Sequence, residues 1–149
     1  MRIARFMDGK GIVRWGIVEE EEIKETEGLK GPYTGEKYPL KGVRLLAPAE
    51  PTKIVCVGKN YVDHIEEMDG EVDQLPKEPG LFLKAPNALA DPGEVIPYPH
   101  FTNEFHYEGE LAVVIAKPMR MVSDEEALNY VLGYTCAFDL TARDAQRKD

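Results

Sequence analysis

The chain has 149 residues, the size of one ordinary domain with room for a small appendage. Its formal net charge of -9 argues against a nucleic-acid-binding surface, because a phosphate backbone requires clustered Lys and Arg. A small anionic substrate is compatible with this charge if a local cation reverses its sign. The sequence contains neither a signal-peptide pattern nor a long apolar run, so we expect a soluble, cytoplasmic protein without membrane contact.

The first 48 residues predict a small strand-rich unit. Alternating apolar residues predict strands at 2–6 and 13–18, joined by a tight turn. The acidic run 19–22 is typical of a solvated hairpin edge. The segment 27–42 is rich in Gly and Pro, which predicts a linker or an extended crossing segment.

A second unit is expected to begin at residue 49. Its apolar runs predict strands at 53–57, 81–84, 95–96, 110–116 and 134–138, and helices at 60–68 and 124–132. Ser123 and Glu126 have the spacing of a capping box at the start of the second helix, and Gly133 is expected to end it.

Two glutamates lie at the start of the clearest strand of this unit. Side chains alternate between the faces of a strand, so His106, Glu108 and Glu110 are expected on the same side as Ala112 and Val114. Two like charges carried into an apolar interior without a counterion are costly, and a divalent cation removes that cost. The pair therefore predicts a metal centre. The alternative is two solvated glutamates, because Glu-x-Glu by itself is a common pattern.

Asp139, at the end of a predicted strand, is the best candidate for a third ligand. Ligation by oxygen atoms alone is what Mg²⁺, Mn²⁺ and Ca²⁺ prefer, and Mg²⁺ leaves several positions to water or substrate. His106 is a further candidate ligand, whereas a surface location is its ordinary explanation.

Other residues have the chemistry to act on a substrate. His64 and Glu67 lie three apart on a predicted helix, so the carboxylate can orient the imidazole to take a proton from water. An exposed His beside an exposed Glu is the simpler alternative. Lys84, Arg143 and Gln146 are candidates for clamping an anionic substrate, although each by itself is typical of a protein surface.

Four motifs occur in an order that resembles the fumarylacetoacetate hydrolase family. They are Lys53–Tyr61 followed by His64 and Glu67, Leu81–Lys84, Tyr107–Leu111 and Asp139–Asp144. The likeness runs from about Pro48 to the last residue, and the preceding segment is similar to a small N-terminal extension that many bacterial and archaeal members carry.

The resemblance implies an α+β, β-rich fold, in which a mixed β-sandwich roll with few helices forms a catalytic domain over 49–149, after the unit 1–48. It also implies a homodimer. Relatives continue beyond the point where this sequence stops and supply a further catalytic lysine there, so we expect the catalytic domain to be truncated at its C-terminus. The implied roles are metal ligation by Glu108, Glu110 and Asp139, water activation by His64 and Glu67, and substrate contact by Lys84, Arg143 and Gln146.

The implied activity is a divalent-metal-dependent reaction of a small 2-oxo acid through a metal-stabilised enolate, with Mg²⁺ or Mn²⁺ as the metal and Ca²⁺ also compatible. Acylpyruvate-type hydrolysis of a carbon–carbon bond is the leading expectation. The alternatives are decarboxylation of oxaloacetate, or decarboxylation and isomerisation of hydroxyheptadienedioates as in aromatic catabolism. A hypothesis of another class is a truncated fragment that binds metal or ligand without turnover.

Overall fold

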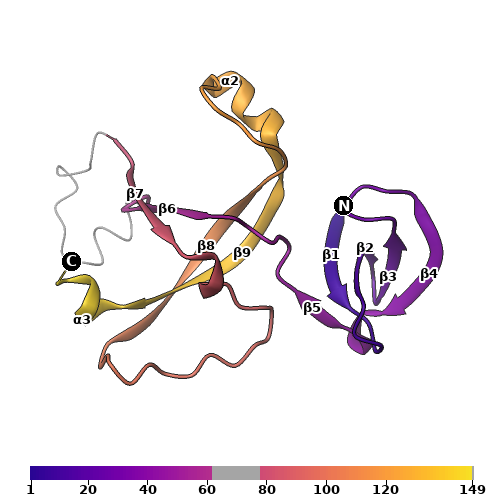
Figure 1. Cartoon of the computed structure of the whole chain (residues 1–149), viewed down its shortest axis with the longest axis horizontal. Helices are drawn as coiled ribbons and strands as arrows, with labels where there is room; N and C mark the ends of the chain where they lie inside the picture. The colour runs from indigo at the N-terminus through magenta and orange to yellow at the C-terminus, as the bar shows by residue number, and fades with distance from the viewer. Residues whose placement is uncertain (62–77, 149) are drawn as a thin grey trace. The chain divides into compact units, whose positions relative to one another are not determined.

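The computed structural model describes residues 1–61 and 78–148 (Figure 1). Strands dominate the described residues and helices are few and short, which confirms the predicted β-rich fold class. The chain packs as two compact units, one made of Met1–Ala49 with Gly93–Asp149 and the other of Glu50–Pro92. The predicted helix over 60–68, with His64 and Glu67, lies almost wholly outside the described residues.

The N-terminal segment forms a five-stranded antiparallel sheet in the order β4-β3-β2-β1-β5 (Figure 1). Ala4 and Phe6 alternate with more exposed residues along β1, and Ile23 faces them from β3. Phe6 and Ile23 are fully buried, and the ring of Tyr38 packs against Phe6. The strands are β1 (Arg2–Met7), β2 (Val13–Glu19), β3 (Glu22–Thr26), β4 (Tyr33–Pro39) and β5 (Arg44–Leu46).

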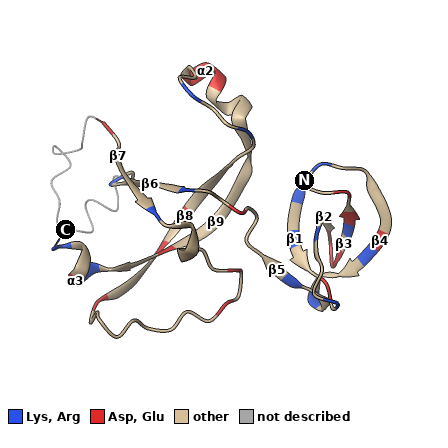
Figure 2. Ribbon diagram, in the orientation of Figure 1, with Lys and Arg blue, Asp and Glu red and all other residues tan. Residues whose placement is uncertain are grey.

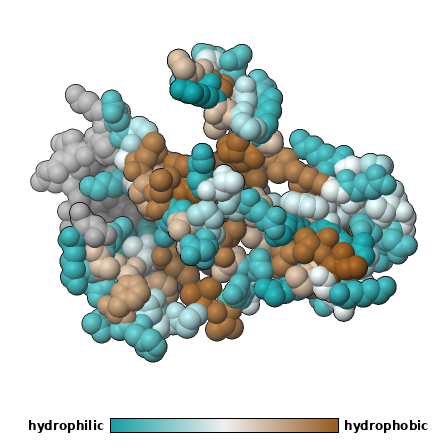
Figure 3. Space-filling view, viewed as in Figure 1, coloured by the Kyte–Doolittle hydropathy of each residue, from teal (hydrophilic) through white to brown (hydrophobic). Residues whose placement is uncertain are grey.

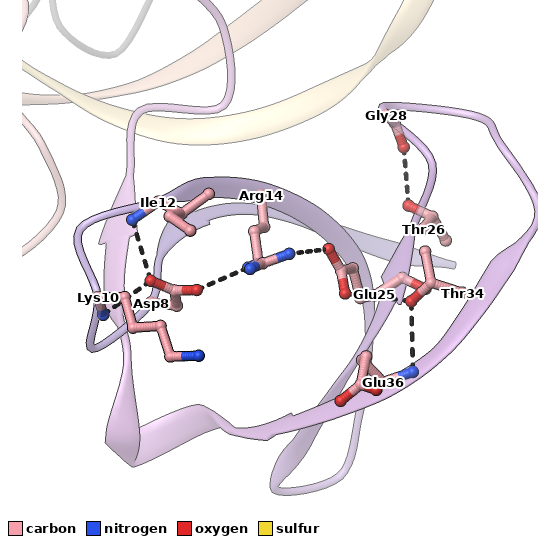
Figure 4. Close-up of polar contacts among 9 residues, drawn as sticks. All are labelled: Asp8, Lys10, Ile12, Arg14, Glu25, Thr26, Gly28, Thr34 and Glu36. Carbon is pink, nitrogen blue, oxygen red and sulfur yellow. Dashed lines mark hydrogen bonds and ion pairs between the residues drawn. The ribbon is translucent and has the colours of Figure 1, made fainter.

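The turn between β1 and β2 is fixed by Asp8. Its carboxylate accepts hydrogen bonds from the backbone N–H groups of Lys10 and Ile12, each at 2.9 Å (Figure 4). Its other oxygen accepts a bond of 2.7 Å from Nε of Arg14, whose Nη1 lies 2.5 Å from Oε1 of Glu25. One arginine therefore neutralises two buried carboxylates on neighbouring parts of the sheet.

The prediction of a linker over 27–42 was wrong. Residues 33–39 form the edge strand β4, which pairs with β3, and Leu40–Gly42 form the short 3-10 helix η1. The pairing register shifts between Lys24 and Thr26, and Gly35 on the opposite strand has a φ of 100° that glycine tolerates. The glycine therefore marks a strand irregularity rather than a linker.

The second compact unit contains a two-stranded antiparallel hairpin. β6 (Ile54–Gly58) pairs with β7 (Gly80–Lys84), so that Ile54 lies opposite Lys84 and Gly58 opposite Gly80. Both strands agree with their predicted positions to within one residue. The 3-10 helix η3 (Pro86–Ala88) follows, and Pro86 at its first position ends the strand.

A long hairpin carries the carboxylates of the predicted metal centre. β8 (Phe105–Ile115) pairs with β9 (Val131–Ala142) along nearly its whole length. The predicted strand at 95–96 was wrong, because residues 94–99 are irregular and Pro97 and Pro99 lack the N–H groups of a ladder.

The predicted helix over 124–132 is shorter than expected. It consists of α2 (Asp124–Ala127) and the 3-10 helix η4 (Leu128–Tyr130), after which the chain enters β9. The N–H of Ala116 donates to the carbonyl of Tyr130 at 2.7 Å, so the hairpin ladder replaces a further helical turn and Gly133 lies within the strand. Ser123 is the N-cap residue as predicted, but its side chain makes no cap hydrogen bond.

Candidate metal centre

The pairing of β8 with β9 places three carboxylates on one face of the hairpin. Glu108 lies directly opposite Asp139, and Glu110 lies opposite Ala137, two residues further along. Directly opposite residues share a face and have Cβ atoms about 5 Å apart, whereas diagonal neighbours are separated by about 7–8 Å. Glu and Asp side chains are long enough for carboxylates at these Cβ separations to reach a common cation.

The carboxylate face is more protected from solvent than the other face. Glu108, Glu110, Ala112 and Val114 are half-buried, whereas their neighbours of opposite parity along β8 are exposed. Glu108 and Glu110 are therefore partly shielded from solvent, although they do not lie in the fully apolar interior that the sequence predicted. The apolar residues of opposite parity along β8 face solvent.

Thr141 lies next to both carboxylates of the cross-strand pair. Its hydroxyl donates to Oε1 of Glu108 at 2.9 Å and lies 3.4 Å from Oδ1 of Asp139. Thr141 is two residues beyond Asp139 on β9 and therefore on the same face. Sequence reasoning assigned it no role, although the alternation of strand side chains would have placed it beside Asp139.

Arg143 binds the second oxygen of Glu108. Its Nη2 lies 2.9 Å from Oε2 of Glu108, and its Nη1 donates to the side-chain oxygen of Gln146 at 2.9 Å. The side chain of Arg143 is only 10% exposed. Within the described part of the chain, its Nε is buried without a hydrogen-bond partner.

The backbone turn after β9 fixes this arginine. The N–H of Arg143 donates to the carbonyl of Glu104 at 2.8 Å, and the short helix α3 (Arg143–Gln146) begins there. Asp144 accepts hydrogen bonds from the Thr102 hydroxyl and from the N–H of Asn103 at 3.0 Å. These two bonds, the one from Thr102 first, hold the pKa of Asp144 below its ordinary value.

Five of the predicted residues lie on β8, β9 and α3: Glu108, Glu110, Asp139, Arg143 and Gln146. Acidic and basic residues are both present on these elements (Figure 2). Lys84 ends β7 in the other compact unit. His64 and Glu67 lie outside the described residues. His106 is on the carboxylate face, opposite Thr141. All these assignments stay predictions.

The donor set fits a divalent cation that prefers oxygen ligands. Three carboxylates on one half-buried face offer hard oxygen donors of the kind that Mg²⁺, Mn²⁺ and Ca²⁺ take. In residues 1–61 and 78–148, no three His, Cys, Asp or Glu side chains are gathered closely enough to hold an ion as they stand. Binding of an ion would therefore require these carboxylates to change their side-chain conformations.

Sequence comparison defines the class of protein to which this hairpin belongs. Residues 53–149 match the fumarylacetoacetate hydrolase C-terminal family, and residues 1–48 match the family described as Rv2993c-like, N-terminal. The chain belongs to the fumarylacetoacetate hydrolase family, which confirms the resemblance inferred from its motifs.

The individual relatives are named for different activities. The chain is 44% identical to oxaloacetate tautomerase YisK of Bacillus subtilis, over 74% of this chain and 38% of the relative. It is 36% identical to the structure of 2-hydroxyhepta-2,4-diene-1,7-dioate isomerase from Mycobacterium marinum, with a TM-score of 0.84 over 100% of this chain and 57% of that one.

A third relative was solved with a metal ion. Maleylpyruvate hydrolase from Sphingobium sp. SYK-6, in complex with manganese(II) and pyruvate, is 28% identical with a TM-score of 0.68, over 96% of this chain and 60% of that one. The chain spans about half the length of the curated relatives that it matches. Members of the family are enzymes, and no helix in the described residues has the length and apolarity needed to cross a membrane.

Proposed function

We propose that this chain is the metal-binding part of an enzyme that acts on a small 2-oxo acid through an enolate. The observation that carries the proposal is the face shared by Glu108, Glu110 and Asp139, with the buried guanidinium of Arg143 bonded to one end of it. Three carboxylates share this face, and their negative charges would weaken the binding of a 2-oxo acid anion. A divalent cation bound between the hairpin carboxylates and the substrate anion would attract both of these negatively charged groups.

Glu108, Glu110 and Asp139 would hold the cation, with Mg²⁺ or Mn²⁺ favoured and Ca²⁺ compatible. When bound, such a cation supplies Lewis-acid stabilisation of the negative charge that develops on the oxygen of an enolate. The carboxylates would fix its position on the hairpin, and the ladder between β8 and β9 would keep that position rigid during the reaction.

Arg143 is proposed to bind the substrate carboxylate. Its Nη groups are engaged with Glu108 and Gln146, whereas its buried Nε has no partner among the described residues. A guanidinium held by two neighbours loses little entropy when it binds an anion, which favours recognition of a carboxylate. Gln146 would orient Arg143 and contact the same ligand, and Lys84 is proposed as a second cationic contact.

His64 and Glu67 are proposed to move the proton. With Glu67 orienting the imidazole, His64 would remove a proton from water for hydrolysis, or from the carbon beside the oxo group for tautomerisation. The same pair thus serves both reaction types.

Acylpyruvate-type hydrolysis of a carbon–carbon bond is our first candidate for the overall reaction, because the pair of His64 and Glu67 suits activation of water. A second candidate is tautomerisation of oxaloacetate, which the identity of 44% to a relative of that name favours. Decarboxylation or isomerisation of an oxo-dicarboxylate shares the same enolate and is a further alternative. The competing hypothesis is a fragment that binds metal and ligand without turnover.

One experiment separates these candidates. Mn²⁺ binding to the full 149-residue chain is measured by calorimetry, and turnover is assayed with acetylpyruvate and with oxaloacetate in the presence of Mg²⁺. Glu110→Gln is expected to abolish metal binding and turnover, whereas His64→Ala is expected to spare metal binding and lose turnover. Glu126→Gln, at an exposed glutamate of α2, is the matched control.

The outcomes discriminate among the hypotheses. Hydrolysis of acetylpyruvate supports the first candidate, and conversion of the enol of oxaloacetate without cleavage supports the second. Metal binding with neither activity favours the binding fragment. Normal Mn²⁺ affinity in Glu110→Gln would contradict the proposed metal centre.

A further inference from the structure

Thr141 makes two contacts that a strand threonine does not ordinarily make. A threonine suits a strand because its side chain is β-branched, and its hydroxyl on a partly exposed face ordinarily bonds water or its own backbone. Here the hydroxyl lies 2.9 Å from Oε1 of Glu108 on the partner strand and 3.4 Å from Oδ1 of Asp139 on its own strand. It therefore bridges the two opposed carboxylates of the hairpin.

A second threonine on the same face of β9 provides a comparison. Thr135 has the same parity as Thr141 and lies opposite Ala112. Among the described residues, its hydroxyl donates to the neighbouring carbonyl of Cys136, at 3.4 Å, and to no carboxylate. The bridging arrangement of Thr141 thus follows from its position next to the carboxylates, not from its residue type or its strand.

Both oxygens of Glu108 are engaged in the structure. Oε1 accepts from Thr141, and Oε2 lies 2.9 Å from Nη2 of Arg143. A carboxylate bonded at both oxygens is restricted to one rotamer and one plane, whereas an exposed glutamate samples several. The one hydroxyl proton of Thr141 donates to Oε1 of Glu108, and this bond offsets part of the repulsion between Glu108 and Asp139.

We infer that Thr141 is a positioning residue of the metal centre, whose hydroxyl orders the cross-strand pair of Glu108 and Asp139 from which a divalent cation would be bound. The inference rests on the proposed function and adds a residue to it. Hydrogen bonds to ligating carboxylates fix the orientation of the ligand, and their loss typically lowers metal affinity about 10- to 100-fold.

Substitution of the hydroxyl tests the inference. In the full chain, Thr141→Val keeps the shape and the strand preference of the side chain and removes only the hydrogen bonds. Its Mn²⁺ affinity, measured by calorimetry and by the electron paramagnetic resonance signal of free Mn²⁺, is expected to fall about 10- to 100-fold. Thr141→Ser, which restores the hydroxyl, and Thr135→Val are both expected to retain the affinity of the unmodified chain.

A metal-free measurement distinguishes a failure of the inference from a failure of the proposed function. The carboxyl carbon-13 resonances of Glu108 and Asp139 are recorded without metal, and Thr141→Val is expected to shift both, whereas Thr135→Val shifts neither. If the unmodified chain binds no Mn²⁺, the proposed metal centre is wrong, and these resonances alone decide whether Thr141 orders the carboxylates.

Two results would overturn the inference itself. The first is Mn²⁺ affinity in Thr141→Val equal to that of an unmodified chain that does bind Mn²⁺, which would leave the proposed metal centre intact. The second is an equal loss of affinity in Thr141→Val and Thr141→Ser, because that would assign the effect to packing instead of the hydroxyl.

Discussion

Arg14 and Arg143 each neutralise carboxylates that the fold has brought to neighbouring strands or turns. Arg14 bonds Asp8 and Glu25 inside the N-terminal sheet (Figure 4), and Arg143 bonds Glu108 on the hairpin. All of the Arg14 partners belong to the sheet, and the ion pairs raise the pKa of Arg14 further above its ordinary value. Arg143, by contrast, keeps an unpartnered buried Nε within the described structure, which suits a residue that binds a ligand.

Asp8 gives the N-terminal sheet a dependence on pH. The hydrogen bond from Arg14, followed by the one from the N–H of Ile12, holds the pKa of Asp8 below its ordinary value. Because the folded pKa is depressed, the stabilisation is present above the ordinary carboxyl pKa of about 4 and is lost as pH falls through the folded value. We predict that Asp8→Asn lowers the stability of the sheet at pH 7 and that its difference from the unmodified chain shrinks toward pH 3.

Urea denaturation followed by the fluorescence of Trp15 measures this effect, since Trp15 is the single tryptophan of the chain and lies on β2. The unmodified chain and Asp8→Asn are compared at each pH, which cancels the contribution of Asp144 and other carboxylates. A stability difference that is the same at pH 7 and pH 3 would contradict the linkage to Asp8.

Strands β2 and β3 approach each other closely at a glycine. An added Cβ at Gly16 would collide with Cγ2 of Ile23 and would lie 2.6 Å from the carbonyl oxygen of Lys24. Since Ile23 is fully buried, it has little room to yield. Gly16→Ala is therefore expected to destabilise the sheet by about 1–3 kcal/mol, the usual cost of overpacking.

The same fluorescence measurement reports on this substitution, because Trp15 is adjacent to Gly16. Gly9→Ala is the matched control: a Cβ at Gly9 meets no described atom within 4 Å. If Gly16→Ala is as stable as the unmodified chain, the prediction of overpacking is wrong. In that case β2 and β3 can move apart at Ile23 with little loss of stability.

The hairpin of β8 and β9 has two chemically different faces. One carries the half-buried carboxylates, and the other carries aromatic and aliphatic residues that face solvent. Tyr107 and Phe138 lie on the second face, with their rings in an edge-to-face arrangement at a centroid distance of 6.1 Å. The apolar residues therefore contact one another but bury little of their surface.

At the scale of the whole molecule, exposed hydrophobic side chains are numerous (Figure 3). Tyr107 is 77% exposed and Phe138 is 73% exposed. Monomeric proteins rarely leave large contiguous apolar patches in water. We predict that the chain binds the hydrophobic dye 8-anilinonaphthalene sulfonate and that the hairpin is a major site of binding.

Polar substitutions on the hairpin test this prediction. Leu111→Thr combined with Phe138→Thr keeps the strand preference and removes apolar surface, so dye fluorescence is expected to fall by about half or more if the hairpin dominates the exposed apolar area. Val95→Thr, at a residue that is 88% exposed outside any strand, is the control. Unchanged fluorescence in the double variant would place the dye elsewhere, for example on β6 and β7.

Much of the architecture was predictable from local patterns. Alternation at 2–6 and an apolar run at 81–84 identified the strands Arg2–Met7 and Gly80–Lys84, because both patterns are local properties of the chain. The edge strand Tyr33–Pro39 was missed, since its Gly and Pro residues are tolerated only where a bulge and a sheet edge accommodate them. The helix after Ser123 is shorter than predicted. The N–H of Ala116 donates to the carbonyl of Tyr130 across the hairpin, and this contact between strands is not visible in the local sequence.

The sequence by itself determined the family of this protein and its strand-rich class. It also gave the candidate ligands Glu108, Glu110 and Asp139, because motif order and strand parity can be read directly from the residues. Only the tertiary structure decided that Glu108 lies opposite Asp139 and that Thr141 and Arg143 bind its two oxygens. Those contacts depend on the register between strands separated by about 30 residues, and register is a property of the paired strands that neither strand carries alone.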